Sequence, residues 1–83
     1  GMPEHPRTAA IVVNPVKVDE PALREALAAA EERWGWAQTL WLETTQDDPG
    51  AGQTKQALEE GVDVVIAAGG DGTVRTVAEA LRG

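Results

Sequence analysis

The sequence predicts an α/β protein in which a parallel sheet of three strands lies between layers of helices, a three-layer αβα architecture. Short apolar runs within residues 9–13, 36–45 and 62–68 alternate with longer segments whose apolar residues recur at helical spacing. The first and third runs are continuously apolar rather than alternating, which indicates strands covered on both faces, as in a parallel sheet. The 83 residues are enough for one small domain.

The first strand and the first helix have clear boundary residues. Ala9–Val13 is a buried strand that ends at Asn14-Pro15, because the residue before a proline disfavours helical geometry. Asp19 caps the helix, and Pro21 suits its first turn. Gly35 ends the helix, whose apolar residues share one face: Leu23, Ala26, Leu27, Ala30 and Trp34.

The second half of the chain repeats the alternation of strand and helix. Residues 36–45 are a second strand, and Asp48 caps a second helix that has Pro49 at its first position and ends near Glu60. The apolar face of this helix is weak: Ala51, Thr54, Ala57 and Leu58. Residues 62–68 form the third strand. A third helix follows the glycine-rich turn, with an inner face of Val74, Val77, Ala78 and Leu81.

Strand order 2-1-3 is preferred, and order 1-2-3 remains an alternative. Order 2-1-3 places the first helix on one face of the sheet and the other two on the opposite face. It brings Asn14-Pro15 beside the glycine turn, at the switch point where open α/β sheets bind ligands. The third strand would then lie at an edge although its residues are those of a central strand. We expect a further strand of a longer protein, or a second copy of the chain in a homodimer, beside it.

Composition excludes several classes of function. The net charge of −7, with seven scattered lysines and arginines, excludes a basic nucleic-acid-binding face. There is no cysteine, which excludes disulfides and fits a cytoplasmic protein. No apolar run approaches the roughly 20 residues of a transmembrane segment. Gly1-Met2 is typical of a tag remnant, and residues 1–8, with the single histidine His5, are read as a lead-in.

The strongest candidate for ligand binding or catalysis in the chain is the turn Gly69-Gly70-Asp71-Gly72-Thr73. It lacks the lysine of a Walker A loop and the third glycine of a dinucleotide fingerprint, whose place Arg75 takes. Its glycines let a phosphate approach the backbone at a helix N-terminus. Asp71 suits a magnesium ion bridging to phosphates or the acceptance of a hydroxyl proton. Thr73 and Arg75 can reach phosphate oxygens. A tight turn with Asp71 as helix cap is equally compatible with the spacing.

Three sequence elements in order resemble the diacylglycerol kinase catalytic domain family, which includes sphingosine kinases and is related to NAD kinase. They are residues 11–15, ending in Asn14-Pro15, then Glu43-Thr44-Thr45, and residues 64–74 with the glycine turn. The resemblance covers residues 8–83 and implies a Rossmann-like N-terminal part of that fold. It implies ATP and Mg²⁺ as cofactors and a lipid hydroxyl, such as that of diacylglycerol, as phosphate acceptor.

The resemblance also implies roles for individual residues. Those that line the nucleotide site are Asn14, Thr45, Gly69, Gly70, Gly72 and Thr73. Asp71 is the catalytic or metal-binding residue. The chain departs from the family pattern at Val16-Lys17-Val18, where many members have a small residue and a glycine, and at Arg75-Thr76, where many have Asn-Glu. The first departure removes the small residue and the glycine of the turn after the first strand, where family members contact phosphate.

The expected domain division is a lead-in at residues 1–8 and the N-terminal part of an ATP-binding lipid kinase domain at 9–83, whose lipid-binding part lies beyond. The isolated chain is therefore expected to be inactive, and the longer protein to be cytoplasmic or peripheral at the membrane. Two alternatives remain: NAD kinase, which shares the Gly-Gly-Asp-Gly-Thr turn, and a non-catalytic module that binds nucleotide or self-associates.

Overall fold

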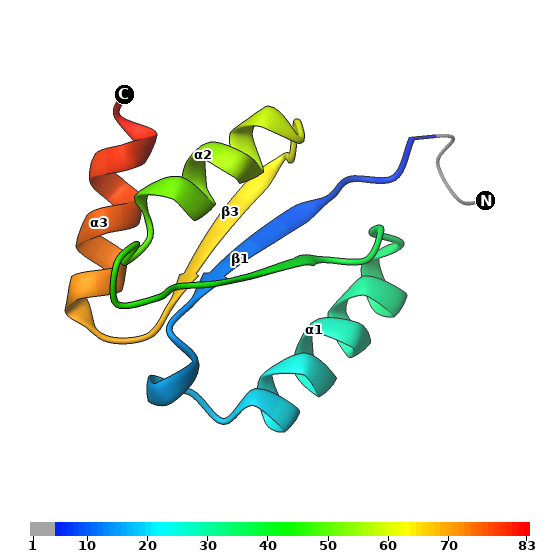
Figure 1. Ribbon diagram of the computed structural model, residues 1–83. Helices are drawn as coiled ribbons and strands as arrows, with labels where there is room; N and C mark the ends of the chain where they lie inside the picture. The colour runs from blue at the N-terminus through cyan, green and yellow to red at the C-terminus, as the bar shows by residue number, and fades with distance from the viewer. Residues whose placement is uncertain (1–4) are drawn as a thin grey trace.

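A three-stranded parallel sheet lies between helices on its two faces (Figure 1). Its strands are β1 (Ala9–Val13), β2 (Leu40–Glu43) and β3 (Val64–Ala68), in the order β2-β1-β3. The predicted fold class and strand order are confirmed. The computed structural model describes residues 5–83, so the predicted tag remnant at residues 1–2 lies outside the described residues.

The central strand β1 forms the core of the domain. All five of its residues are buried, and the side chains of Ile11, Val12 and Val13 are wholly inaccessible to solvent. The strand has a neighbour on each side and helices over both faces, so side chains of either orientation are covered. Each such aliphatic side chain contributes about 1.5–3 kcal/mol through burial. The continuous apolar run of the sequence follows from this central position.

Helix α1 (Glu20–Trp34) covers one face of the sheet and packs loosely. Asp19 caps it by accepting a hydrogen bond from the amide of Ala22, and Gly35 ends it with a left-handed φ of 71°, as predicted. However, no residue of α1 is buried, and Trp34 is 68% exposed. Trp34 lines a hollow between α1 and the sheet together with Leu27 and Ala30, so it lies on the predicted face of the helix, but the prediction that it packs as a buried residue was wrong because this hollow is not filled.

Two polar contacts connect α1 to the β2 side of the sheet. The Arg24 guanidinium lies 4.0 Å from the centre of the Trp41 ring. The Glu31 carboxylate accepts a hydrogen bond from the amide of Thr39 at 2.7 Å, just before β2 begins. Strand β2 is shorter than the predicted 36–45, because only residues 40–43 follow β1 in parallel register.

Helices α2 (Ala51–Glu59) and α3 (Asp71–Leu81) lie side by side on the opposite face (Figure 1). Helix α2 begins after Gly50, so the prediction of Pro49 as first helical residue was wrong, and Gly50 rather than Asp48 is the N-cap. The Asp48 carboxylate nevertheless accepts a hydrogen bond from the amide of Gly52 in the first turn of α2. Gly50 is buried at a φ of 142°, and a Cβ there would lie 3.3 Å from Thr76 Cγ2. A glycine at this position lets the start of α2 approach α3 closely.

The inner stripe of α3 differs from the predicted one. Thr73 and Val77 are buried, whereas Val74 is 49% exposed and Leu81 45% exposed. Helix α3 presents to α2 and β3 the stripe that starts at Thr73, one residue before the predicted one. A threonine therefore takes an inner position that hydrophobic spacing assigned to valine. None of the helices in residues 5–83 combines the length and apolarity required to cross a bilayer.

Candidate functional site

The carboxyl ends of the three strands meet at one edge of the sheet, where the predicted site residues follow them (Figure 1). Val13 pairs in register with Glu43 on one side and with Ala68 on the other. Beyond this row, the amide of Thr44 donates to Val13 O at 2.8 Å, and the amide of Asn14 donates to Ala68 O at 2.9 Å. The structure thus brings together the three segments on which the site was predicted.

The backbone conformation and the close packing at position 69 both require a glycine. Its φ is 150°, and a Cβ there would lie 2.9 Å from Asn14 Cβ and 3.0 Å from Thr73 Oγ1. The turn after β3 is therefore in contact with both the residue after β1 and the first turn of α3. Thr73 is buried in this contact, with little of its side chain open to a ligand.

Gly70 and Gly72 differ from Gly69, because a Cβ at either would meet no atom within 4 Å. Gly70 has an ordinary φ of −84° and is the N-cap of α3, while Gly72 lies in the first turn of the helix. Their backbone is therefore open to solvent at a helix N-terminus. Among the described residues 5–83 no side chain accepts from the amides of Asp71 and Gly72, so these two amides at the start of α3 are available to an anion.

Asp71 is the first residue of α3 and is exposed. The alternative in which Asp71 caps the helix is wrong, because Gly70 occupies that position and no side-chain capping bond forms. Arg75 lies one turn further on and is also exposed. Within residues 5–83 the ion pair that forms is Arg24–Glu20, so Arg75 and Asp71 are not paired with each other there.

Asn14 and Thr45 both have side chains engaged in local turns. Asn14 Oδ1 accepts from the amide of Val16 at 3.2 Å and caps a single 3-10 turn, η1 (Pro15–Lys17). Thr45 Oγ1 accepts from the amide of Asp48 at 3.0 Å, and the amide of Thr45 donates to Asp48 O at 2.9 Å. Asp48 in turn accepts from the amide of Gly52 at the start of α2.

Sequence reasoning missed Gln53 in this region. Its Nε2 donates to Glu43 O at 2.9 Å and to Asp48 O at 3.0 Å, across the segment that contains Thr45. A glutamine in an exposed-looking helical turn carries no signal of such a contact. Only the weak apolar face of α2 hinted that polar residues contribute to its packing.

The residues present fit a phosphate-bearing ligand better than an isolated metal ion. Within residues 5–83, no three acidic or histidine side chains lie close enough together to hold a metal. Asp71 is the carboxylate of the glycine turn itself. A magnesium ion there would need oxygen ligands from a bound phosphate, as is common for Mg²⁺.

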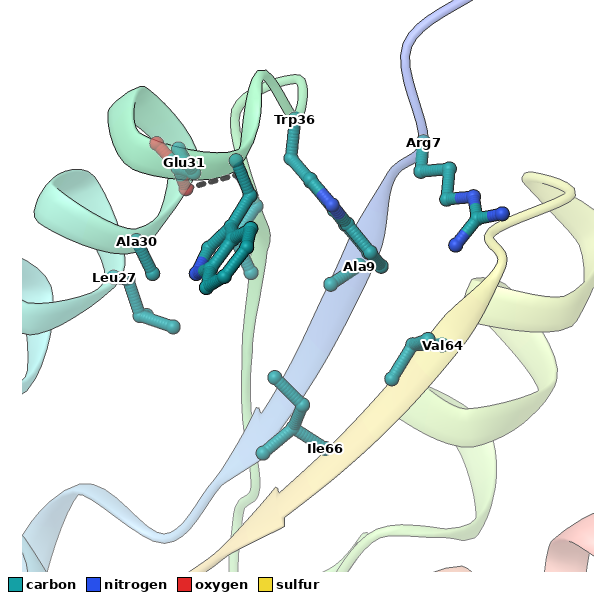
Figure 2. A pocket seen from close by; sticks show the side chains of 10 residues that line it. Arg7, Ala9, Leu27, Ala30, Glu31, Trp36, Val64 and Ile66 are labelled. Atoms are coloured by element: carbon teal, nitrogen blue, oxygen red, sulfur yellow. Dashed lines mark hydrogen bonds between the residues drawn. The ribbon is translucent and has the colours of Figure 1, made fainter.

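An apolar hollow lies elsewhere, between α1 and the sheet (Figure 2). It has a volume of about 450 Å³ and is mainly apolar, with Leu27, Ala30 and Ile66 in its lining. Figure 2 shows Leu27 and Ala30 on α1, and Ile66 on the face of β3 that α1 covers. Such walls suit apolar packing rather than a triphosphate.

Comparison with known proteins gives one family. The model of the diacylglycerol kinase catalytic domain matches residues 8–83. A search of curated proteins gave no match. The match spans all three strands and all three helices, including the glycine turn and the segments that meet it. This chain belongs to the diacylglycerol kinase catalytic domain family.

Proposed function

We propose that residues 9–83 are the N-terminal, nucleotide-binding part of an ATP-dependent lipid kinase. The observation that carries the proposal is the N-terminus of α3, where Gly70 makes no side-chain capping bond and the backbone of Gly70 and Gly72 is open, while the adjoining Gly69 lies against Asn14 at the end of β1. Helix N-termini with accessible amides favour phosphate groups. Family membership supports kinase chemistry, with a lipid hydroxyl such as that of diacylglycerol as acceptor.

In this proposal the phosphates lie along the backbone at Gly69, Gly70 and Gly72, and Thr73 packs against Gly69 to support the turn. Asn14 and Thr45 border the nucleotide from the neighbouring strands. Arg75 is near enough along α3 to add positive charge to the phosphate region. Because the chain is acidic overall, the backbone amides at the start of α3 and Arg75 are the groups of the glycine turn and α3 that would offset phosphate charge alongside Mg²⁺.

Asp71 has the catalytic role in the proposal. Bound Mg²⁺ would neutralise charge on the phosphates and orient them. Asp71 is the residue that would hold this ion, or accept the proton of the lipid hydroxyl as its oxygen bonds to the γ-phosphorus of ATP and the bond from that phosphorus to ADP breaks. The exposure of Asp71 at the first position of α3 supports either role. The lipid would bind to a part of the protein beyond these residues, at the membrane surface in the cytoplasm.

The test is transfer of labelled phosphate from Mg-ATP to diacylglycerol by the full-length protein. Asp71→Asn should abolish most of the transfer, whereas Glu79→Gln, which removes an exposed carboxylate from the same helix, should leave it intact. Equal activity of wild type and Asp71→Asn would show that the role of Asp71 is wrong. Phosphorylation of NAD without phosphorylation of lipid would establish an NAD kinase instead.

The chain by itself is expected to bind Mg-ATP weakly and to have no turnover, because a glycine turn is only one part of a phosphoryl-transfer site. Titration of the 83-residue chain with Mg-ATP, with the amides of Gly70 and Thr73 observed by NMR, tests the binding. Absence of shifts at millimolar ATP would leave the chain a structural role. Sedimentation in the same buffer tests whether two copies pair along the open edge of β3.

A further inference from the structure

One side chain joins the two ends of the segment that follows β2. Gln53, in the first turn of α2, donates from Nε2 to the main-chain oxygen of Glu43 and to that of Asp48. The two oxygens flank residues 44–47, here called the Thr45 loop. A single amide group therefore holds the entry and the exit of the Thr45 loop together.

The Gln53 amide has one usable orientation. Both bonds to the loop use Nε2, while Oε1 is buried and has no hydrogen-bond partner within residues 5–83. Turning the amide over would place Oε1 against two carbonyl oxygens, none of which can donate. An unpaired buried oxygen is unfavourable. The side chain is thus arranged to hold the loop rather than to satisfy its own oxygen.

Within the Thr45 loop, the Thr45 hydroxyl is oriented by the residue that Gln53 holds. Thr45 Oγ1 accepts from the amide of Asp48, and the Asp48 oxygen accepts from both Thr45 N and Gln53 Nε2. Since its oxygen already accepts a hydrogen bond, the Thr45 hydroxyl has its hydrogen left to donate. No group within residues 5–83 accepts that hydrogen.

We propose that Gln53 is a positioning residue of the nucleotide site: it ties Glu43 to Asp48 and so directs the Thr45 hydroxyl toward an oxygen of bound ATP. The inference rests on the proposed function, because it takes ATP as the ligand. Gln53 itself touches only the loop. Its effect on ATP must therefore pass through Thr45, which makes the two residues non-additive.

The variants that test this are Gln53→Met, which keeps the length of the side chain and removes the donors, and Gln53→Glu, which sets a carboxylate against two carbonyl oxygens. Matched controls are Gln56→Met and Gln56→Glu, since Gln56 is exposed on the same helix and its side chain makes no hydrogen bond within residues 5–83. The Gln56→Glu control carries the same added charge as Gln53→Glu.

In the full-length protein, Gln53→Met should raise the KM for ATP about tenfold, which corresponds to about 1.4 kcal/mol. The value of kcat and the KM for diacylglycerol should not change. Both Gln56 variants should keep a KM for ATP lower than that of the corresponding Gln53 variant. Thr45→Val should raise the KM for ATP as well. The double variant Thr45→Val with Gln53→Met should have a KM for ATP little higher than that of Thr45→Val alone. A wild-type KM in Gln53→Met, or full additivity with Thr45→Val, overturns the inference.

Asp71→Asn in the same assay distinguishes failure of the positioning role of Gln53 from failure of the kinase proposal. If Asp71→Asn is inactive and Gln53→Met behaves as wild type, the positioning role is wrong and the kinase proposal stands. If the wild type transfers no phosphate from ATP, the kinase proposal fails and the inference fails with it. If thermal denaturation shows that Gln53→Met is unfolded at the assay temperature, the KM for ATP of Gln53→Glu is compared with that of Gln56→Glu instead. A higher KM for Gln53→Glu supports the inference, and equal values overturn it.

Discussion

Gly69 lies against Asn14 so closely that a methyl group on the glycine would come within 2.9 Å of Asn14 Cβ. This contact joins the turn after β3 to the turn after β1, across the edge where the predicted nucleotide site lies. From α3, Thr73 Oγ1 would lie 3.0 Å from the same methyl group. Two of the three family-like elements of the sequence are thus joined by direct packing at a glycine.

Gly69→Ala should destabilise the domain strongly. The positive φ of 150° is unfavourable for alanine, and the added methyl meets two side chains at once. The strained backbone alone costs roughly 1–3 kcal/mol. Each kcal/mol lowers the melting temperature by roughly 4–8 °C in a domain of this size. Thermal denaturation followed by circular dichroism measures the effect.

The control for this experiment is Gly70→Ala, at a neighbouring position with ordinary φ and open space around the added methyl. It should melt close to the wild type. Equal melting temperatures for Gly69→Ala and Gly70→Ala would mean that the close packing against Asn14 is not maintained in solution.

Gly72→Ala should separate stability from ligand binding. The residue lies in the first turn of α3 with no atom near its missing side chain, so alanine gains up to about 1 kcal/mol in helix propensity. The same methyl would stand where we propose that phosphate approaches the backbone. ATP affinity, measured by titration calorimetry, should fall about tenfold, or by about 1.4 kcal/mol. Unchanged affinity would place the phosphates away from Gly72.

Gly50→Ala should loosen the contact between α2 and α3. The backbone φ of 142° and the 3.3 Å approach to Thr76 Cγ2 both oppose a side chain, and the strain costs roughly 1–3 kcal/mol. Gly61→Asn is a suitable control, because its φ of 73° is one that asparagine tolerates and nothing lies within 4 Å. Chemical denaturation should show a clear loss for Gly50→Ala alone. A larger loss for Gly61→Asn would contradict this account.

Arg24→Ala should weaken the attachment of α1 to the sheet. Its guanidinium lies over the Trp41 ring at 4.0 Å, a cation–π contact worth about 0.5–1 kcal/mol at an exposed site. The ion pair of Arg24 with Glu20 is solvent-exposed on both sides, so Glu20→Gln should cost less. Tryptophan fluorescence during urea unfolding reports both changes. The reverse order of the two losses would identify the ion pair as the main contact.

The sequence by itself predicted the fold class, favoured the strand order and located the glycine turn. Continuous apolarity in residues 9–13 indicated burial on both faces, which β1 has as the central strand, whereas the equally apolar β3 lies at an edge with Val64 41% exposed. Capping by Asp19 and termination at Gly35 were readable because they depend on local backbone geometry. Once the strands are parallel and in the order 2-1-3, Asn14 and Gly69 must lie at one edge.

Tertiary structure decided which side chains of the helices face inward and which glycines are indispensable. Hydrophobic spacing placed Trp34 and Leu81 inside, yet both are exposed, because the layout of α1 and the rotation of α3 depend on packing between layers. Gly50 is required at the start of α2 because of its approach to Thr76 on α3. The hydrogen bonds of Gln53 to Glu43 and Asp48 likewise depend on how α2 packs against the segment after β2. Such contacts join residues far apart or differently oriented in the chain, so no local pattern encodes them.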